Sequence, residues 1–252
     1  MRVLGLDIGS RSVDAVWLDG DRVVERAVAD SGFDPQAVAS FLSEMDGFER
    51  VVATGYGRHA AASALGADVV TEIKAYALGV AHLYPDARAV LDIGGQDTKV
   101  ISLGPRGKVL DFEMNDKCAA GTGKFLEVMA RALGFELDEL GPAALDVRSG
   151  VRISSMCTVF AESEVTGLVH RGEDLRRIAL GLHDAIASRT LATLARVCPS
   201  GPLVFAGGVA RNPAMARLIA DGFDGEVLVP EECQTVGALG AALSARADSH
   251  AR

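Results

Sequence analysis

Two stretches of this sequence repeat each other within one chain. "LDIGSRSVDAVWLDGDRVVE" begins at position 6, and "LDIGGQDTKVISLGPRGKVLD" begins at position 91, which is 85 positions later (91 − 6). This offset aligns Asp7 with Asp92 and Gly9 with Gly94. Each copy has the pattern of an apolar strand, a glycine corner, a second strand, a turn and a third strand. The repeat predicts two similar α/β lobes, each of which opens with a β-meander.

The rest of the chain continues the α/β pattern. Helices are predicted from about position 35, over 58–65, 73–83, 122–133, 160–169 and 174–196, and from 213, with further strands over 50–55, 202–208 and 226–230. The segment "YPDAR" at 84–88 has the composition of a boundary. We therefore expect lobe I over 1–86 and lobe II over 87–234, with a terminal helix over 235–252 that packs back on lobe I.

Each repeat places an aspartate directly before a glycine corner. Because phosphates do not bind carboxylates directly, Asp7 and Asp92 point to a bridging metal, and Mg²⁺ takes one or two carboxylates together with waters and phosphate oxygens. Gly9 and Gly94 leave backbone N–H groups open to those oxygens. A single copy would be no more than a strand end followed by a turn. Two aligned copies favour a Mg-nucleotide site.

The residues around the two corners differ, and this suggests separate tasks. Lys99 offers charge to a phosphate, and Gln96 or Asp97 could orient an attacking water, which are parts that phosphoryl transfer uses. The further residues that we expect to contact phosphates are Ser10, Arg11 and Gly95.

A third glycine loop, "FAGGVARNP" at 205–213, ends a predicted strand and begins a helix. Asn212 suits the N-cap position, and Pro213 suits the first helical position. Gly207 and Gly208 leave room for a ligand against the backbone. Since the loop follows two phosphate corners in chain order, Gly207, Gly208 and Asn212 are predicted to border the adenosine side of the site.

Composition excludes several classes of function. The chain has 252 residues, is 49% hydrophobic and carries a net charge of −9 without a basic cluster, which argues against nucleic acid as a partner. No apolar run approaches the roughly 18 residues of a membrane span, and no targeting segment is recognised. We expect a cytosolic protein without a membrane partner, in which the four cysteines are thiols, catalytic residues or metal ligands rather than disulfides.

One cysteine stands at a glycine-rich helix entry, in "NDKCAAGTGKFLEVMARALG" at 115–134. Cys118 comes three residues before Gly121, and Gly121 and Gly123 are expected to contact an anion. Cys157 similarly precedes the helical stretch "VFAESEVTGLV". A helix N-terminus stabilises a thiolate and so favours metal binding. The residues alone leave two readings open for both cysteines, a buried structural thiol or a metal ligand, and for Cys118 a third, an incidental residue of a nucleotide loop.

The motifs resemble those of the ATPase superfamily of actin, sugar kinases and the large heat-shock chaperones. "DIGS" and "DIGGQD" are similar to its two phosphate motifs, and "GGVARN" is similar to its adenosine motif. Within it, "ATGYGR" (53–58), "TEIKAYALG" (71–79), "DIGGQDTKVI" (92–101), "MNDKCAAGTGKFLEVMARAL" (114–133) and "ISSMCTVFAESEV" (153–165) resemble the ATP-dependent activators of 2-hydroxyacyl-CoA dehydratases and benzoyl-CoA reductases. The resemblance implies two duplicated ribonuclease-H-like lobes with a nucleotide cleft between them.

The same resemblance implies a chemistry. In such activators two cysteines, here Cys118 and Cys157, bind a 4Fe–4S cluster shared across a homodimer, so that each chain supplies two of four ligands. The implied protein is a cytoplasmic ATPase of anaerobic metabolism that uses ATP, Mg²⁺ and one cluster per dimer. It takes an electron from ferredoxin or flavodoxin and passes it at low potential to a CoA-ester dehydratase or reductase.

The sequence departs from the pattern at two positions. Asp14 stands where the superfamily commonly has a lysine, and Tyr76 stands where many relatives have a histidine. Two other functions remain open: a small-molecule kinase of the same superfamily, which would have no use for paired cysteines, and a non-enzymatic nucleotide-gated scaffold.

Overall fold

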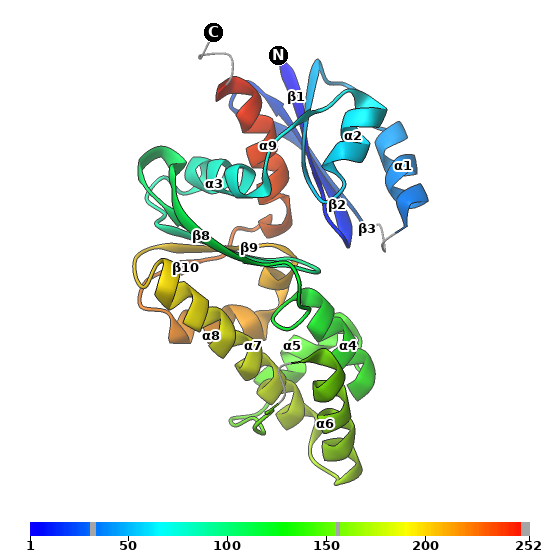
Figure 1. The fold of residues 1–252 in the computed structure, drawn as a ribbon, viewed down its shortest axis with the longest axis vertical. Coiled ribbons are helices and arrows are strands. Elements are labelled where there is room, and N and C mark those ends of the chain that lie inside the picture. Colours follow the sequence, from blue (N-terminus) through cyan, green and yellow to red (C-terminus); the bar gives the residue numbers. More distant parts are fainter. Residues whose placement is uncertain (31–33, 155–156, 248–252) are drawn as a thin grey trace. The chain divides into compact units, whose positions relative to one another are not determined.

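The computed structural model describes residues 1–30, 34–154 and 157–247 (Figure 1). This part of the chain has an α/β fold with two five-stranded sheets of the same strand order, β3-β2-β1-β4-β5 and β8-β7-β6-β9-β10. The first sheet consists of β1 (Arg2–Ile8), β2 (Ser12–Asp19), β3 (Arg22–Asp30), β4 (Arg50–Gly55) and β5 (Asp68–Val69). The second consists of β6 (Ala89–Ile93), β7 (Thr98–Leu103), β8 (Val109–Asn115), β9 (Leu203–Ala206) and β10 (Val227–Leu228). The predicted duplication is confirmed, because each repeat forms the first three strands of one sheet.

The chain divides into two compact units. The first unit contains 1–90, 101–111 and 231–252, and the second contains 91–100 and 112–230. The helices of the first unit are α1 (Pro35–Ser43), α2 (Arg58–Leu65), α3 (Glu72–Leu83) and α9 (Val236–Ala247). Those of the second are α4 (Gly123–Leu133), α5 (Leu137–Leu145), α6 (Thr158–His170), α7 (Leu175–Val197) and α8 (Pro213–Gly222). The lobe boundary between 86 and 87 stays a prediction, and residues 248–252 of the expected terminal helix lie outside the described residues.

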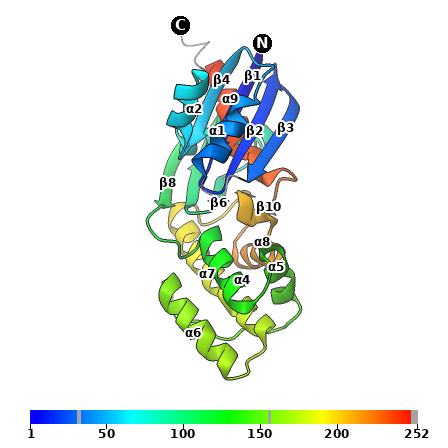
Figure 2. The same ribbon diagram turned by 90° about the vertical axis from the view of Figure 1, so that its right-hand side faces the viewer.

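The first sheet is covered on both faces, and the apolar sequences of its central strands reflect this. One face of β1, β2 and β4 packs with α9, and the other packs against residues of α1 and α2 (Figures 1 and 2). Because both faces are buried, β1 reads as a nearly continuous apolar run. The sheet thus packs into the core of the first unit along both faces.

Helix α9 approaches its neighbours more closely than ordinary side chains allow. A Cβ atom on Gly240 would collide with the carbonyl oxygen of Ala75 in α3, and one on Gly79 would collide with that of Val236. A Cβ atom on Gly5 of β1 would collide with the carbonyl oxygen of Ala238. These glycines bring helix against helix and helix against strand at backbone distance.

Helix α5 was not predicted, and its sequence explains the omission. "LDELGPAAL" contains Gly141 and Pro142, which normally break helices. Two interactions offset that cost. Glu136 and Glu139 form a reciprocal capping box at the start of the helix, and the buried residues Leu140 and Ala144 lie on a helix that packs against α7 and α8.

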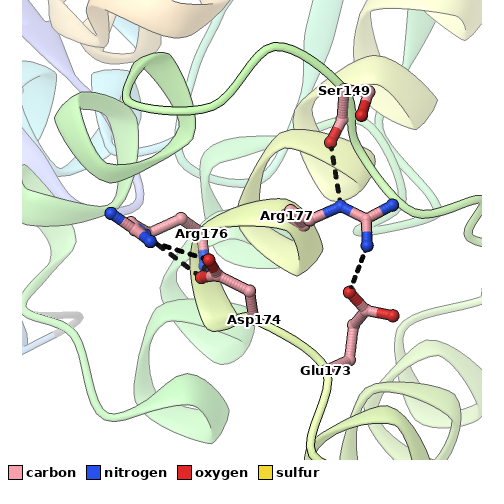
Figure 3. Close-up of polar contacts among 5 residues, drawn as sticks. All are labelled: Ser149, Glu173, Asp174, Arg176 and Arg177. Atoms are coloured by element: carbon pink, nitrogen blue, oxygen red, sulfur yellow. Dashed lines mark hydrogen bonds and ion pairs between the residues drawn. The ribbon is translucent and has the colours of Figure 1, made fainter.

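Helix α7 begins in a set of charged contacts (Figure 3). Asp174 caps the helix by accepting from the Arg176 backbone N–H, and its carboxylate also accepts two bonds from the Arg176 guanidinium. The side-chain hydrogen bond from Arg176 lowers the pKa of Asp174 to about 2. Arg177 donates to Glu173 and to the Ser149 carbonyl oxygen, which ties the loop after α5 to the start of α7.

A series of buried hydrogen bonds joins α7 to α8. His183 Nδ1 lies 2.7 Å from the Ala179 carbonyl oxygen and therefore donates, which leaves Nε2 as the acceptor from Asn212 Nδ2 at 3.0 Å. Asn212 Oδ1 in turn accepts from the backbone N–H groups of Ala214 and Met215. The predicted N-cap at Asn212 is confirmed, and a fully buried imidazole fixes the orientation of its amide.

No helix in the described part of the chain is both long enough and apolar enough to cross a membrane.

We predict that Gly240→Ala lowers the free energy of unfolding of the first unit by about 3 kcal/mol or more, because the new methyl group meets backbone rather than a movable side chain. Urea denaturation followed by circular dichroism measures this. Gly167→Ala is the matched control: its Cβ would meet only the tip of Arg171 at 3.5 Å, so helix α6 should be unchanged or more stable. Equal effects of the two variants would contradict the close packing of α3 and α9.

A second prediction concerns pH. Burial lowers the pKa of His183 below its ordinary value of 6.5, so the unfolded chain binds more protons than the folded one just below that pH. Stability should therefore fall as the pH drops below about 6.5 and level off below the folded-state pKa. Urea midpoints at several pH values should show this slope in the native protein and a smaller slope in His183→Gln. Identical slopes would show that the imidazole is not held neutral.

Candidate functional site

The first glycine corner joins β1 to β2. Gly9 N donates to the Ser12 carbonyl oxygen at 2.9 Å, which closes a short turn directly after the strand. Asp7 is 6% exposed and lies near the end of β1, on the side of the sheet that faces α9. Gly55 ends the neighbouring strand β4 with a φ of 86°, and a Cβ atom there would lie 2.6 Å from Asp7 Oδ1. Position 55 must therefore be glycine for the Asp7 carboxylate to lie where it does.

The second corner has the same construction. Gly94 N donates to the Asp97 carbonyl oxygen at 2.9 Å, as Gly9 does to Ser12. Gly207 directly follows β9 with a φ of 85°, and a Cβ atom there would collide with Asp92 Oδ1. The structure thus brings the predicted third glycine loop beside the aspartate of the second corner. Gly208 starts a short 3₁₀ segment (Gly208–Arg211), and no atom lies within 4 Å of the position of its Cβ.

Helix α4 begins at this second corner. The backbone N–H groups of Gly123 and Lys124 donate to the carbonyl oxygens of Gly94 and Gly95, at 2.9 and 2.7 Å. A Cβ atom on Gly123 would lie 3.0 Å from the Gly94 oxygen. The corner that carries Asp92 is therefore built from glycine backbone of three segments that are distant in the sequence.

Lys99 occupies a buried ion-pair cluster at the same corner. Its Nζ lies 2.9 Å from Asp92 Oδ2 and 2.7 Å from Asp97 Oδ2, and its side chain is 3% exposed. Two carboxylates offset the cost of burying the ammonium group. Asp92 Oδ1 is buried and has no hydrogen-bond partner among the described residues. An oxygen of this kind fits a water of a hydrated Mg²⁺ ion, because Mg²⁺ keeps several waters when it binds.

The other residues that were predicted to act at the phosphates lie in the turns of the two glycine corners. Gln96 is exposed, and Ser10 and Gly95 are half-buried. Arg11 lies 3.4 Å from the carboxylate of Asp30 across the sheet, so its guanidinium is held near the first corner.

Cys118 lies in a loop that is fixed at several points. Asn115 Nδ2 donates to the carbonyl oxygens of Cys118 and Ala120, and Thr98 Oγ1 donates to that of Gly121 at 2.7 Å. The N-cap of α4 is Thr122, so the cysteine stands a few residues ahead of the helix rather than at its first turn. The cysteine itself is exposed.

Cys157 is the N-cap residue of α6 and is exposed as well. Ser154 donates from both its backbone N and its hydroxyl to the carboxylate of Glu164, which ties the preceding segment to α6. Ser155 and Met156 of the cysteine motif lie outside the described residues. The sequence did not predict the contact between Ser154 and Glu164, because a serine and a glutamate ten residues apart form no recognisable motif.

The four cysteines fall into two classes. Cys118 and Cys157 are exposed, and they precede the helices α4 and α6, which pack against one another (Figure 2). Cys198 and Cys233 are buried. Among the described residues no group of three or more His, Cys, Asp or Glu side chains could hold a metal ion. One chain thus offers two accessible sulfur ligands in these segments.

Comparison with known proteins gives a consistent picture. The model of the BadF/BadG/BcrA/BcrD ATPase family matches residues 4–245. The activator of lactoyl-CoA dehydratase from Anaerotignum propionicum is 42% identical over 97% of this chain and 97% of its own length.

Two solved structures are similar over almost their whole lengths. Component A of (R)-2-hydroxyglutaryl-CoA dehydratase from Acidaminococcus fermentans has a TM-score of 0.92 at 36% identity, and the match covers 99% of both chains. The activator of 2-hydroxyisocaproyl-CoA dehydratase from Clostridium difficile, solved with bound ADPNP, has a TM-score of 0.90 at 38% identity, and the match covers 100% of this chain and 96% of the other. The duplicated fold, the two glycine corners and these matches show that the chain belongs to the BadF/BadG/BcrA/BcrD ATPase family.

Proposed function

We propose that this chain is an ATP-hydrolysing activator that drives low-potential one-electron transfer to a 2-hydroxyacyl-CoA dehydratase or a related CoA-ester reductase. The observation that carries the proposal is the pair of exposed cysteines ahead of two packed helices, in a family whose similar members are named as dehydratase activators. The proposed setting is the cytoplasm of an anaerobic cell, with reduced ferredoxin or flavodoxin as the electron donor.

The nucleotide part of the proposal assigns tasks to both corners. Asp7 and Asp92 would act through Mg²⁺, whose charge would neutralise phosphate oxygens. The backbones of Gly9, Gly94 and Gly95 would donate to those oxygens, with Ser10 and Arg11 at the first corner. Gln96, exposed at the tip of the second, would orient an attacking water. The ADPNP bound to a similar protein supports a nucleotide as the ligand.

Lys99 would act mainly through charge balance. Its ammonium holds the carboxylates of Asp92 and Asp97 at a fixed separation and cancels much of their repulsion of a phosphate. A direct contact with phosphate would draw Nζ away from one of them. Gly207 and Gly208 would border the nucleoside. Asn212 would border the nucleoside too. Its side-chain amide is already bonded to His183 and to the N-terminus of α8, so its contribution would be to position the start of that helix.

The cysteine part of the proposal requires two copies of the chain. A 4Fe–4S cluster has four cysteine ligands, so Cys118 and Cys157 from each of two chains would complete one cluster. Val159 and Phe160, which are 67% and 66% exposed beside Cys157, would be covered by the second copy. Gly121, with a φ of 88°, shapes the loop that presents Cys118. When bound, the cluster would store the transferred electron. Each 59 mV by which ATP lowers the reduction potential would change the equilibrium constant of a one-electron transfer tenfold.

The test of the cluster is chemical analysis of anaerobically purified protein. The native protein should be brown and contain about four iron atoms and four acid-labile sulfides per dimer. Cys118→Ser and Cys157→Ser should each lose the iron and still bind ATP, while the matched control Cys198→Ala, at a buried cysteine, should keep it. A colourless native dimer that phosphorylates a sugar would instead support a kinase, and a colourless dimer without ATPase activity would support a nucleotide-gated scaffold.

The test of the nucleotide site uses Gly208, whose Cβ position is open in this structure. Gly208→Val should leave the melting temperature nearly unchanged but weaken ATP binding about tenfold or more, or ~1.4 kcal/mol, because the side chain would enter the space of the nucleoside. Isothermal titration calorimetry measures the affinity, with Gly167→Ala as the control. Unchanged affinity would remove this loop from the proposed site.

A further inference from the structure

The side chain of Asn212, at the end of the third glycine loop, is held by residues of α5, α7 and α8, which pack against one another (Figure 1). As the N-cap of α8, its Oδ1 accepts from the backbone N–H groups of Ala214 and Met215, at 3.0 and 3.1 Å. From α7, His183 Nε2 lies 3.0 Å from Asn212 Nδ2. In α5, a Cβ atom on Gly141 would lie 2.6 Å from Asn212 Oδ1, so the glycine lets that helix approach the cap.

The two ring nitrogens of His183 have different partners, and this fixes the position of its hydrogen. Nδ1 lies 2.7 Å from the carbonyl oxygen of Ala179, which can only accept, so Nδ1 carries the hydrogen. Nε2 is therefore unprotonated and accepts from Asn212. Burial of the ring also favours the neutral form, because it lowers the pKa of His183. An imidazolium would turn a second hydrogen toward the hydrogens of the amide.

The hydrogen bonds of the Asn212 amide can be counted completely. An amide side chain has two acceptor positions on its oxygen and two hydrogens on its nitrogen. Two backbone N–H groups occupy the oxygen, and His183 accepts one hydrogen. Exchanging the oxygen and nitrogen would place the NH₂ group against those N–H groups, so the orientation is unique. The second hydrogen of Nδ2 has no partner among the described residues, and the side chain is only half-buried.

This count limits what Asn212 can offer to a ligand beside the loop. Its amide can donate one further hydrogen bond and can accept none. In a nucleoside, the ring nitrogens of the base and the oxygens of the ribose are acceptors, whereas the amino group of adenine is a donor. The fixed amide therefore suits an acceptor atom of the nucleoside and would not bind the adenine amino group.

We propose that His183 is a positioning residue for the nucleotide: its neutral Nδ1–H form holds Asn212 so that the remaining amide hydrogen is donated to an acceptor atom of the nucleoside. The inference deepens the proposed function and rests on it for the place of the nucleoside at this loop. His183 is fully buried and would act only through Asn212. Because other segments build the phosphate corners, His183 would affect the affinity for ATP and not the rate of hydrolysis.

The first experiment measures ATP affinity and steady-state ATPase kinetics. His183→Leu should raise both Kd and KM for ATP about tenfold and leave kcat nearly unchanged, because the amide loses the acceptor that orients it. His183→Gln should recover most of the affinity, since the glutamine oxygen can accept from Asn212 Nδ2. The matched control is His170→Gln at the exposed end of α6, which should bind ATP as the native protein does.

The second experiment observes the ring directly in nucleotide-free native protein, so it does not depend on how well a variant folds. Long-range ¹H–¹⁵N spectra distinguish protonated from unprotonated ring nitrogens, and the signals of His183 are identified by their loss in His183→Gln. We predict a protonated Nδ1 and an unprotonated Nε2. Asn212→Asp keeps a good N-cap but replaces the donor by an acceptor, so Nε2 should gain a hydrogen and ATP should bind more weakly.

Three results would overturn the proposal: a hydrogen on Nε2 in the native protein, unchanged ATP affinity in folded His183→Leu, or equal losses of affinity in His183→Leu and His183→Gln. The last result would show that the acceptor on the ring does not matter. Failure of the proposed function would look different, because the native protein would then show the predicted form of His183 but would bind no ATP.

Discussion

The close approach of an aspartate to a strand-end glycine is the constraint on which both corners depend. The buried aspartate of each repeat lies too close to a glycine of a neighbouring segment for a Cβ atom to fit there, Asp7 beside Gly55 and Asp92 beside Gly207. Both glycines have a positive φ, which side chains rarely adopt. The glycine backbones at the ends of buried strands leave room for these carboxylates, and in the second corner Lys99 also holds Asp92 by an ion pair. Such preorganisation suits phosphate chemistry, in which positioning and charge do most of the work.

Duplication supplied two equal scaffolds, and the charges on them have diverged. Both repeats have the same turn hydrogen bond, and each aspartate lies beside a glycine at or just after the end of another strand. The partner across the sheet is a carboxylate in the first repeat and an ammonium group in the second. In the proposed function, backbone geometry would set where a phosphate can approach, and one side chain per repeat would set the charge that the phosphate meets there.

Sequence patterns predicted the duplicated sheets, most helices and the N-cap at Asn212, because strand periodicity, glycine corners and capping residues are local signals. They missed α5, since Gly141 and Pro142 are offset by a capping box and by burial. They could not show that Lys99 is enclosed by two carboxylates or that His183 holds Asn212, because both depend on the folded arrangement of side chains. The pairing of Asp7 with Asp14 and with Thr54 likewise becomes visible only when the strand register is known.

In the proposed function, the cysteines connect this nucleotide chemistry to electron transfer. Their exposure, which Val159 and Phe160 share near Cys157 in the sequence, contrasts with the burial of Cys198 and Cys233. The central claim, a cluster shared by two chains, is tested most directly by native mass spectrometry of anaerobically prepared protein. We predict a dimer whose mass exceeds that of two chains by one 4Fe–4S cluster, and monomers without iron. Iron–sulfur clusters carried by single chains, or an iron-free dimer, would contradict the claim.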